Sequence, residues 1–326
     1  MFTTPTVVGD VVFQASCSGV IYGIEDGSGD VRWTYDTRQD AGPAQFHGDP
    51  AVVGDLVLTG SDTAEPSFFY ALRAATGELV WKTNVDVIES DVAIADGLAI
   101  GQTFYGDFVA LDVETGERRW RIAADERRCG RRPQAPAVSA GTVFLGAPDG
   151  TVKAVRARDG EVLWSRERGC LSTPLLHWRG AVWGGSPDGN VWALDPETGE
   201  LRGQLDVGGR PHGRPVPVGE STLVVQVGQA EAVGIDAQSL EPRWRYRAEN
   251  ELSSPRPHDL AGLAVVGDSE GNVFALDPRD GSEAWSVRVE GTVRGIGSAK
   301  GKLYVGTLGG RIYKVTPPAQ RKTSDG

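Results

Sequence analysis

The sequence predicts an all-β fold, an eight-bladed β-propeller of four-stranded antiparallel blades, from three observations. A unit of about 40 residues is repeated, and its successive copies end at spacings of 39 to 48 residues. Each copy contains short valine-rich runs separated by Gly, Asp and Pro pairs, which is typical of strands joined by tight turns. No stretch shows a sustained helical period. A repeat of this length with four strand-like runs is typical of a propeller blade, and eight starts imply eight blades.

The fourth unit shows the pattern most clearly. Its apolar runs cover residues 137–138, 143–145, 152–155 and 162–164. The turns between them are Ala140-Gly141, Asp149-Gly150 and Asp159-Gly160. Glycine adopts positive φ at no steric cost, so these pairs are suited to hairpin turns. Each unit is therefore expected to fold as one antiparallel sheet.

A tryptophan ends most of the units, at the same offset from the preceding turn. The positions are Trp33, Trp81, Trp120, Trp164, Trp244 and Trp285, and Gly203 stands where a seventh would fall. Because the residue recurs at one place in the repeat, we expect it to pack between adjacent blades. The Thr-Gly-Glu segment before it is expected to be a hairpin and not a site.

The eighth unit stops early. It starts near Val293 and ends with a strand-like run at residues 311–315, without a tryptophan segment. We therefore expect one propeller domain over residues 1–316, an eighth blade without its outer strand, and a polar tail over residues 317–326. Two interpretations stay open. Either the natural chain continues upstream and supplies the strand, or the eighth blade keeps an open edge that can recruit a partner strand.

Several of the repeated runs carry a family resemblance. They lie at residues 70–72, 109–112, 191–195 and 273–277, each followed by a glycine-containing turn and, in most units, a tryptophan. This pattern resembles the PQQ-type repeat of the quinoprotein alcohol dehydrogenase-like propellers. The resemblance implies an eight-bladed ring. The repeat pattern is also similar to that of the scaffold lipoprotein of the outer-membrane β-barrel assembly machinery and to that of sensor propellers linked to Ser/Thr kinases. One fold hosts many functions, so the resemblance leaves the function open.

Composition limits the partners and the compartment. The formal net charge of −11 argues against a nucleic-acid partner. No apolar run is long enough to span a membrane, and no signal peptide or lipidation cysteine is evident at the start. The chain as given is therefore expected in the cytoplasm, or in the periplasm or outside the cell if an upstream signal or anchor has been removed. The oligomeric state is not specified by the sequence.

Candidate binding residues stand just before the first strand of each blade, where they would line the mouth of the central channel. Blades two and three offer acidic groups at Asp49, Glu89 and Asp91, with His47 nearby. Blades four, six and eight offer Arg131, Arg132, Arg210, His212, Arg214 and Arg294. Separated acid and base could orient a peptide or a small anionic ligand. The alternative is that these are ordinary solvated loop charges.

Two histidines occupy matching places, in His47-Gly48 and His212-Gly213. They belong to blades two and six, which face each other across a ring of eight. They are therefore too far apart to share one metal ion, whose histidine ligands lie about 2 Å from it. No metal site is expected.

Cys129 lies in the most unusual local stretch, which holds seven arginines in residues 118–132. Nearby cations favour a thiolate, so Cys129 is a candidate reactive thiol. Cys170 occupies the matching connection of the next blade, and the two could form a disulfide if their Cα atoms lie within about 7 Å. The alternative is a free cysteine in a solvated loop.

The preferred function is a non-catalytic binding or scaffold propeller that recognises a protein, a peptide or a small anionic ligand at the channel mouth. One alternative is an enzyme using Cys129, His47 or His212 at that mouth. Another is the sensor domain of a longer kinase or exported protein. A quinone-dependent dehydrogenase is disfavoured, because the resemblance would then imply a vicinal cysteine disulfide and a calcium site, and the sequence contains no Cys-Cys pair. No cofactor is expected.

Overall fold

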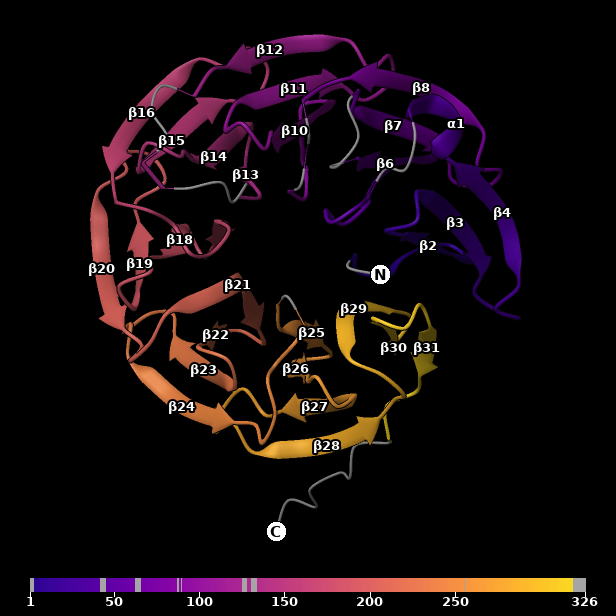
Figure 1. Ribbon diagram of the computed structural model, residues 1–326. Helices are drawn as coiled ribbons and strands as arrows, with labels where there is room; N and C mark the ends of the chain where they lie inside the picture. The colour runs from indigo at the N-terminus through magenta and orange to yellow at the C-terminus, as the bar shows by residue number, and fades with distance from the viewer. Residues whose placement is uncertain are drawn as a thin grey trace.

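The protein is a ring of eight antiparallel sheets, as a computed structural model shows (Figure 1). We call the centre of this ring, around which the innermost strands stand, the channel. The structure describes residues 3–41, 45–61, 66–86, 88, 90–124, 128–129, 134–254 and 256–318. Within these residues, seven sheets have four strands and the eighth has three. Strands follow one another outward from the channel, so β4, β8, β12, β16, β20, β24 and β28 form the rim of Figure 1. The predicted propeller class is confirmed.

The strands have the following bounds. Blades one to four are β1 (Thr6–Val8), β2 (Val11–Ala15), β3 (Val20–Glu25), β4 (Val31–Asp36); β5 (Ala51–Val53), β6 (Leu56–Gly60), β7 (Phe68–Arg73), β8 (Leu79–Asn84); β9 (Ala93–Ala95), β10 (Leu98–Gln102), β11 (Phe108–Asp112), β12 (Arg118–Ile122); β13 (Ala137–Ser139), β14 (Thr142–Gly146), β15 (Thr151–Arg156), β16 (Val162–Glu167). Blades five to eight are β17 (Leu176–Trp178), β18 (Ala181–Gly185), β19 (Asn190–Leu194), β20 (Leu201–Asp206); β21 (Pro211–Val218), β22 (Thr222–Val227), β23 (Glu231–Asp236), β24 (Pro242–Arg247); β25 (His258–Leu260), β26 (Leu263–Gly267), β27 (Asn272–Leu276), β28 (Glu283–Arg288); β29 (Val293–Ala299), β30 (Lys302–Thr307), β31 (Ile312–Val315). One short helix, α1 (Arg38–Ala41), follows blade one.

The position of a strand in its blade decides how many of its side chains are buried. The second strand packs between two neighbouring blades on both faces, so every residue of β10 is buried. The outer strand is buried on one face only, and in β12 the buried side chain is Trp120. The hydrophobic clusters accordingly run between consecutive blades and not within one. Phe13 of blade one, for example, shares a cluster with Val57 and Tyr70 of blade two.

The repeated tryptophan joins each blade to the next. Its indole N–H donates to a carbonyl oxygen in the following blade, in the pairs Trp33–Ala74 (3.0 Å), Trp81–Val113 (3.0 Å), Trp120–Ala157 (2.6 Å), Trp164–Pro196 (2.9 Å) and Trp244–Pro278 (2.9 Å). Three residues after each acceptor stands a glycine with positive φ: Gly77, Gly116, Gly160, Gly199 and Gly281. A Cβ at any of them would lie 2.4 to 3.0 Å from the indole ring, so only glycine fits. The predicted packing role is confirmed for these five tryptophans.

Blade five lacks the repeated tryptophan, and a leucine of blade six fills the space instead. Gly203 stands in the tryptophan place, and the facing position in blade six holds Leu240 in place of glycine. A Cβ at Gly203 would lie 2.5 Å from Leu240 Cδ1, so the leucine fills the space that an indole fills elsewhere. Leu240 keeps the positive φ of the glycines it replaces, at 58°. At this junction the small residue lies on the outer strand of blade five and the large one in the turn of blade six, the reverse of the tryptophan–glycine contacts.

Blade eight meets blade one without a covalent link. The innermost strand β29 approaches the start of the chain so closely that a Cβ at Gly295 would lie 2.7 Å from Thr4 Cα. Lys300 Nζ donates to the carbonyl oxygen of Gly9 at 2.6 Å, which is a second contact between the two blades. The ring is therefore closed by side-by-side packing of the first and last blades, as Figure 1 shows.

The tryptophan contact predicts a large stability effect for Trp164→Ala. Trp164 is 8% exposed, and its removal would leave a void between blades four and five. We expect the free energy of unfolding to fall by about 3–5 kcal/mol, measured by urea denaturation. The neighbouring Leu163 on the same strand is 45% exposed, so Leu163→Ala is the matched control and should change stability by less than about 1 kcal/mol. Equal losses in the two variants would contradict the proposed role of the tryptophan.

Candidate functional site at the channel mouth

Four charged residues from four blades meet at the mouth of the channel. Asp49 and Asp91 stand two residues before the innermost strands β5 and β9, and Arg256 stands two residues before β25. Arg214 lies within β21, where the pairing with β22 is interrupted between His212 and Val216. Arg214 therefore lies in an irregular part of the innermost strand, and its guanidinium lies 3.9 Å from Asp91 Oδ2.

Arg256 crosses the channel to reach both carboxylates. Its guanidinium donates to Asp91 Oδ2 at 3.0 Å and to Asp49 Oδ2. Blade seven, which carries Arg256, lies on the opposite side of the ring from blades two and three (Figure 1). The three side chains are only 15% to 24% exposed. A partly buried ion pair therefore spans the centre of the propeller.

Further contacts extend this ion pair to other blades. Arg214 lies 3.9 Å from Asp91 Oδ2. The backbone N–H of Asp49 donates to Asp91 Oδ1 at 2.8 Å, and the backbone N–H of Thr4 donates to Asp49 Oδ1 at 2.5 Å. Blades one, two, three, six and seven thus all hold one cluster, which we call the channel cluster (Asp49, Asp91, Arg214 and Arg256).

The surroundings of the two carboxyl groups shift their pKa values in opposite directions. Burial opposes ionisation of Asp91, but the positive charges of Arg256 and Arg214 outweigh it and hold the pKa of Asp91 below its ordinary value. Burial dominates at Asp49 and, with the nearby Asp91 carboxylate, raises the pKa of that group despite Arg256. Burial lowers the pKa of Arg214. The cluster thus consists of two cations and two carboxyl groups that depend on one another for charge compensation.

The structure brings together three of the residues selected from sequence: Asp49, Asp91 and Arg214. The acidic and basic groups were expected to stand apart, but Arg256 joins them. The remaining candidates keep their places at the inner ends of blades two, six and eight: His47 before β5, Arg210 before β21, His212 within β21 and Arg294 within β29. Glu89, Arg131 and Arg132 lie outside the described residues. A binding role for all of these stays a prediction.

Sequence reasoning missed Arg256, although a signal was present. The seventh unit contains two prolines in Ser254-Pro255-Arg256-Pro257, so two registers are possible for the start of its first strand. Aligning on Pro257 gives Arg256-Pro257, which matches Asp49-Pro50 and Arg214-Pro215 in the other blades. The residue before the proline is the one that reaches the channel in all three cases.

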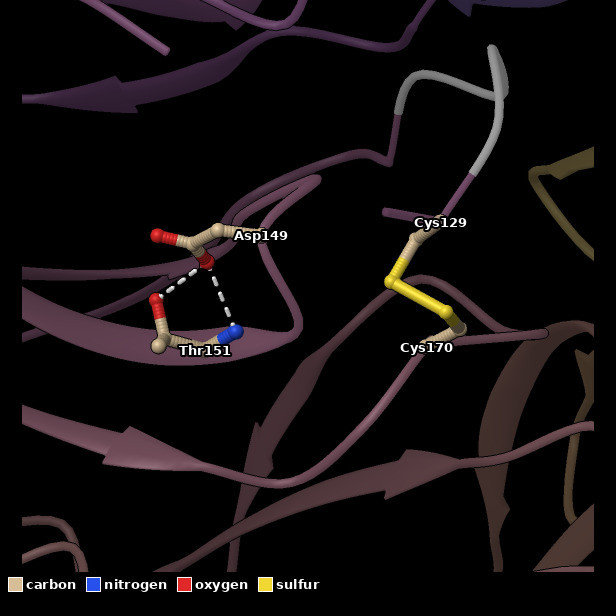
Figure 2. Close-up of a disulfide and its surroundings, with 4 residues drawn as sticks. All are labelled: Cys129, Asp149, Thr151 and Cys170. Carbon is tan, nitrogen blue, oxygen red and sulfur yellow. Dashed lines mark hydrogen bonds between the residues drawn. A yellow bond between two sulfur atoms is a disulfide. The ribbon is translucent and has the colours of Figure 1, made fainter. Parts of the chain in front are cut away.

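Cys129 and Cys170 form a disulfide, with Cα atoms 5.0 Å apart (Figure 2). The bond joins the segment that leads into blade four with the one that leads into blade five. The backbone N–H of Cys129 also donates to the carbonyl oxygen of Pro148 at 3.0 Å. A cysteine in this bond has no thiolate, so in this form Cys129 is neither the free cysteine nor the nucleophile considered above. Cys17 is the remaining thiol.

The described residues contain no group of three His, Cys, Asp or Glu side chains placed to hold a metal ion. In the same residues, no helix is long and apolar enough to cross a bilayer.

Removal of Arg256 should leave two partly buried carboxyl groups without the guanidinium that bonds to both of them. We expect Arg256→Met to lower the free energy of unfolding by about 3 kcal/mol in a denaturant titration. Arg279→Met is the matched control, because Arg279 is 84% exposed in its pair with Asp277, and it should cost less than about 1 kcal/mol. Adding Asp49→Asn and Asp91→Asn to Arg256→Met should recover part of the loss. If the triple variant is less stable than the single one, the carboxylates are not what Arg256 compensates.

A histidine next to the cluster should make stability depend on pH. Burial, and next the positive charge of Arg256, lowers the pKa of His258 to about 4. An unfolded histidine titrates near 6.5, so the unfolded chain binds the proton first as the pH falls. Stability contributed by neutral His258 is therefore complete above about pH 6.5 and is lost between that pH and about 4.

Thermal unfolding across this pH range tests the assignment. The melting temperature should fall from pH 7 to pH 4.5, and His258→Gln should flatten part of that slope. His177, whose pKa burial also lowers, provides the comparison through His177→Gln. An unchanged slope in His258→Gln would show that this residue does not take up the proton.

Comparisons with known proteins agree with this architecture. A family model described as outer membrane protein assembly factor BamB matches residues 1–85, 67–214 and 187–319. BamB of Yersinia pestis is 25% identical over 333 residues, covering 96% of this chain and 84% of the relative. BamB of Escherichia coli K12 is 27% identical over 335 residues, covering 96% and 83%.

Solved structures show the same fold. The crystal structure of BamB from Moraxella catarrhalis matches with a TM-score of 0.80 at 18% identity over 94% of both chains. Quinohemoprotein alcohol dehydrogenase from Comamonas testosteroni matches with a TM-score of 0.73 at 14% identity, over 93% of this chain and 69% of the enzyme. At these identities the likeness concerns the fold alone. The match of the family model along nearly the whole chain shows that this protein belongs to the family of the outer membrane protein assembly factor BamB.

Proposed function

We propose that this chain is a non-catalytic scaffold that binds a protein or peptide on the propeller face where the channel opens. The channel cluster carries the proposal. Its carboxylates are bonded to Arg256 and held near Arg214, so the charged groups at the centre of the face compensate one another. Such an arrangement stabilises a rigid ring and offers no unpaired nucleophile or base. The relatives named as assembly factors support the same role.

A protein or peptide fits this face better than a small anion does. Arg214 and Arg256 lie against Asp91, so a small anion would have to compete with a carboxylate that is already in place. The exposed Arg210 lies at the same end of blade six and is accessible to a larger partner. Contacts spread over several blades would give a protein partner its specificity.

The enzyme alternative is less well supported. The sulfur of Cys129 is bonded to Cys170, and His47 and His212 belong to blades on opposite sides of the ring. We also propose a periplasmic location. Disulfides persist in oxidising compartments, and the relatives carry an outer-membrane name.

Site-specific crosslinking tests the binding face. A photo-reactive amino acid replaces Arg210 at the channel-mouth face, and in a second variant it replaces Arg158 in the β15–β16 hairpin. That hairpin lies on the opposite face, because successive strands of a blade alternate in direction. In the producing cells we expect a discrete crosslinked partner from position 210 and not from position 158.

Charge reversal provides the second measurement. Arg210→Glu should reduce the crosslink formed from a neighbouring mouth position several-fold without changing the melting temperature, since Arg210 is exposed. Arg158→Glu should leave the crosslink unchanged. Equal crosslinking from both faces, or no partner from either, would contradict a channel-mouth scaffold.

A further inference from the structure

The disulfide between Cys129 and Cys170 closes a covalent loop around one whole blade. The two cysteines are 41 residues apart in sequence, and all four strands of blade four lie between them. Those strands pair with one another, and Trp164 joins the blade to blade five through its own hydrogen bond. Blade four is therefore held in the ring by contacts that do not include the sulfur atoms.

The chain around Cys170 is anchored on both sides of the cysteine. Two residues before it, the backbone N–H of Arg168 donates to the carbonyl oxygen of Gly150 in blade four, at 2.9 Å. Two residues after it, the backbone N–H of Ser172 donates to the carbonyl oxygen of Gly185 in β18 of blade five, at 2.8 Å. Cys170 is therefore fixed to two blades by its neighbours, whether or not its sulfur is bonded.

The chain around Cys129 is held differently. Arg128 and Cys129 both donate their backbone N–H groups to one acceptor, the carbonyl oxygen of Pro148, at 2.9 and 3.0 Å. The next backbone anchors among the described residues of this connection lie at Ala124 and Gln134. None of these backbone bonds reaches blade five. Breaking the S–S bond therefore frees this segment from blade five while the opposite sulfur stays in place.

A thiol can approach the disulfide from the channel-mouth face. Both cysteines are half-buried, and both lie in connections on that face. Figure 2 shows the carboxylate of Asp149 pointing away from the sulfur atoms, toward the backbone N–H and the hydroxyl group of Thr151. Exposed disulfides exchange with thiols more readily than buried ones. This bond is therefore open to exchange in the folded chain.

The charges near the two sulfur atoms differ. Arg128 directly precedes Cys129 and is exposed, whereas the guanidinium of Arg168 extends to blade five and donates to the carbonyl oxygen of Gly199 at 3.3 Å. A neighbouring cation favours the thiolate, and a thiol of low pKa is the better leaving group in disulfide exchange. Cys129 is therefore the sulfur that leaves, and Cys170 is the sulfur that is attacked.

We propose that the Cys129–Cys170 disulfide is a redox-active site, which a dithiol reductant opens by thiol–disulfide exchange without unfolding the propeller. The first thiol of the reductant loses its proton and attacks Cys170 Sγ, which forms a mixed disulfide and breaks the bond to Cys129. The Cys129 thiolate takes up a proton. The second thiol of the reductant loses its proton and attacks the mixed disulfide, and the released Cys170 thiolate is protonated in turn. The reductant is oxidised by two electrons to a disulfide, and this chain gains two thiols.

The proposed site does not depend on which partner binds at the channel mouth, and trapping with glutathione tests which of its sulfur atoms is attacked. Glutathione has one thiol, so the reaction stops at the mixed disulfide, which acid quenching and alkylation preserve. Peptide mapping should find glutathione on Cys170 and the alkyl group on Cys129 about tenfold more often than the reverse. Cys17, a half-buried free thiol, should be alkylated in every sample and is the internal reference. Equal amounts of glutathione on the two cysteines would overturn the proposed direction of attack.

A charge reversal tests the part assigned to Arg128. In Arg128→Glu, reduction by dithiothreitol should slow several-fold. In the reduced chain, the pH midpoint for alkylation of Cys129 should lie below about 8.5, the value of an ordinary thiol, and should rise in the variant. Arg158→Glu is the matched control, because Arg158 is 70% exposed in the β15–β16 hairpin on the opposite face, and it should change neither quantity. An unchanged rate and midpoint in Arg128→Glu would overturn the assignment of Cys129 as the leaving sulfur.

Limited proteolysis tests whether reduction frees the Cys129 segment. Trypsin should cleave after Arg128 about tenfold faster in the reduced and alkylated chain than in the oxidised one, and cleavage after Arg158 should not change. Circular dichroism should show the same folded spectrum in both forms. If the bond reacts only in denaturant, or if reduction abolishes the folded spectrum, the disulfide is a structural crosslink and the proposal is wrong.

Discussion

The contact between an outer-strand tryptophan and a glycine of the next blade recurs at five junctions of the ring. Each blade has two apolar faces and cannot bury either of them alone. The indole covers the neighbouring blade, and its N–H satisfies a carbonyl group that the hairpin turn leaves available. Because the glycine has no side chain, the ring lies directly on the backbone. Repetition of one contact therefore sets the spacing of successive blades.

Where the tryptophan is absent, another side chain fills the space that the indole ring occupies elsewhere. At the junction of blades five and six, the large residue has moved from the outer strand to the turn, as Leu240. At the junction of blades eight and one, it has moved to the third strand, as Lys314, and an ammonium group replaces the indole N–H. The second change joins blades eight and one by an ionic contact, and among the described residues it leaves Val31 of blade one 56% exposed beside it.

The channel cluster adds a constraint of a different kind. Contacts between neighbouring blades act around the circumference, whereas Arg256 acts across the diameter by bonding to Asp49 and Asp91. Charges that are partly withdrawn from water need such compensation, and here the partners come from opposite sides of the ring. Arg256 thus links blades two, three and seven across the centre of the propeller.

The architecture of a blade could be predicted from the sequence, because strand runs, glycine turns and the tryptophan are local patterns that repeat. Asp49, Asp91 and Arg214 could also be placed at one level of the channel, since they occupy matching places in the repeat, and Asp49 and Arg214 directly precede a proline. Which of the charged side chains meet depends on how the ring closes in space. Arg256 and Asp49 are separated by five blades along the chain, and the two prolines around Arg256 made its register ambiguous. The pairing of Cys129 with Cys170 and the place of Lys314 were likewise decided in space, because each depends on how one blade lies against the next.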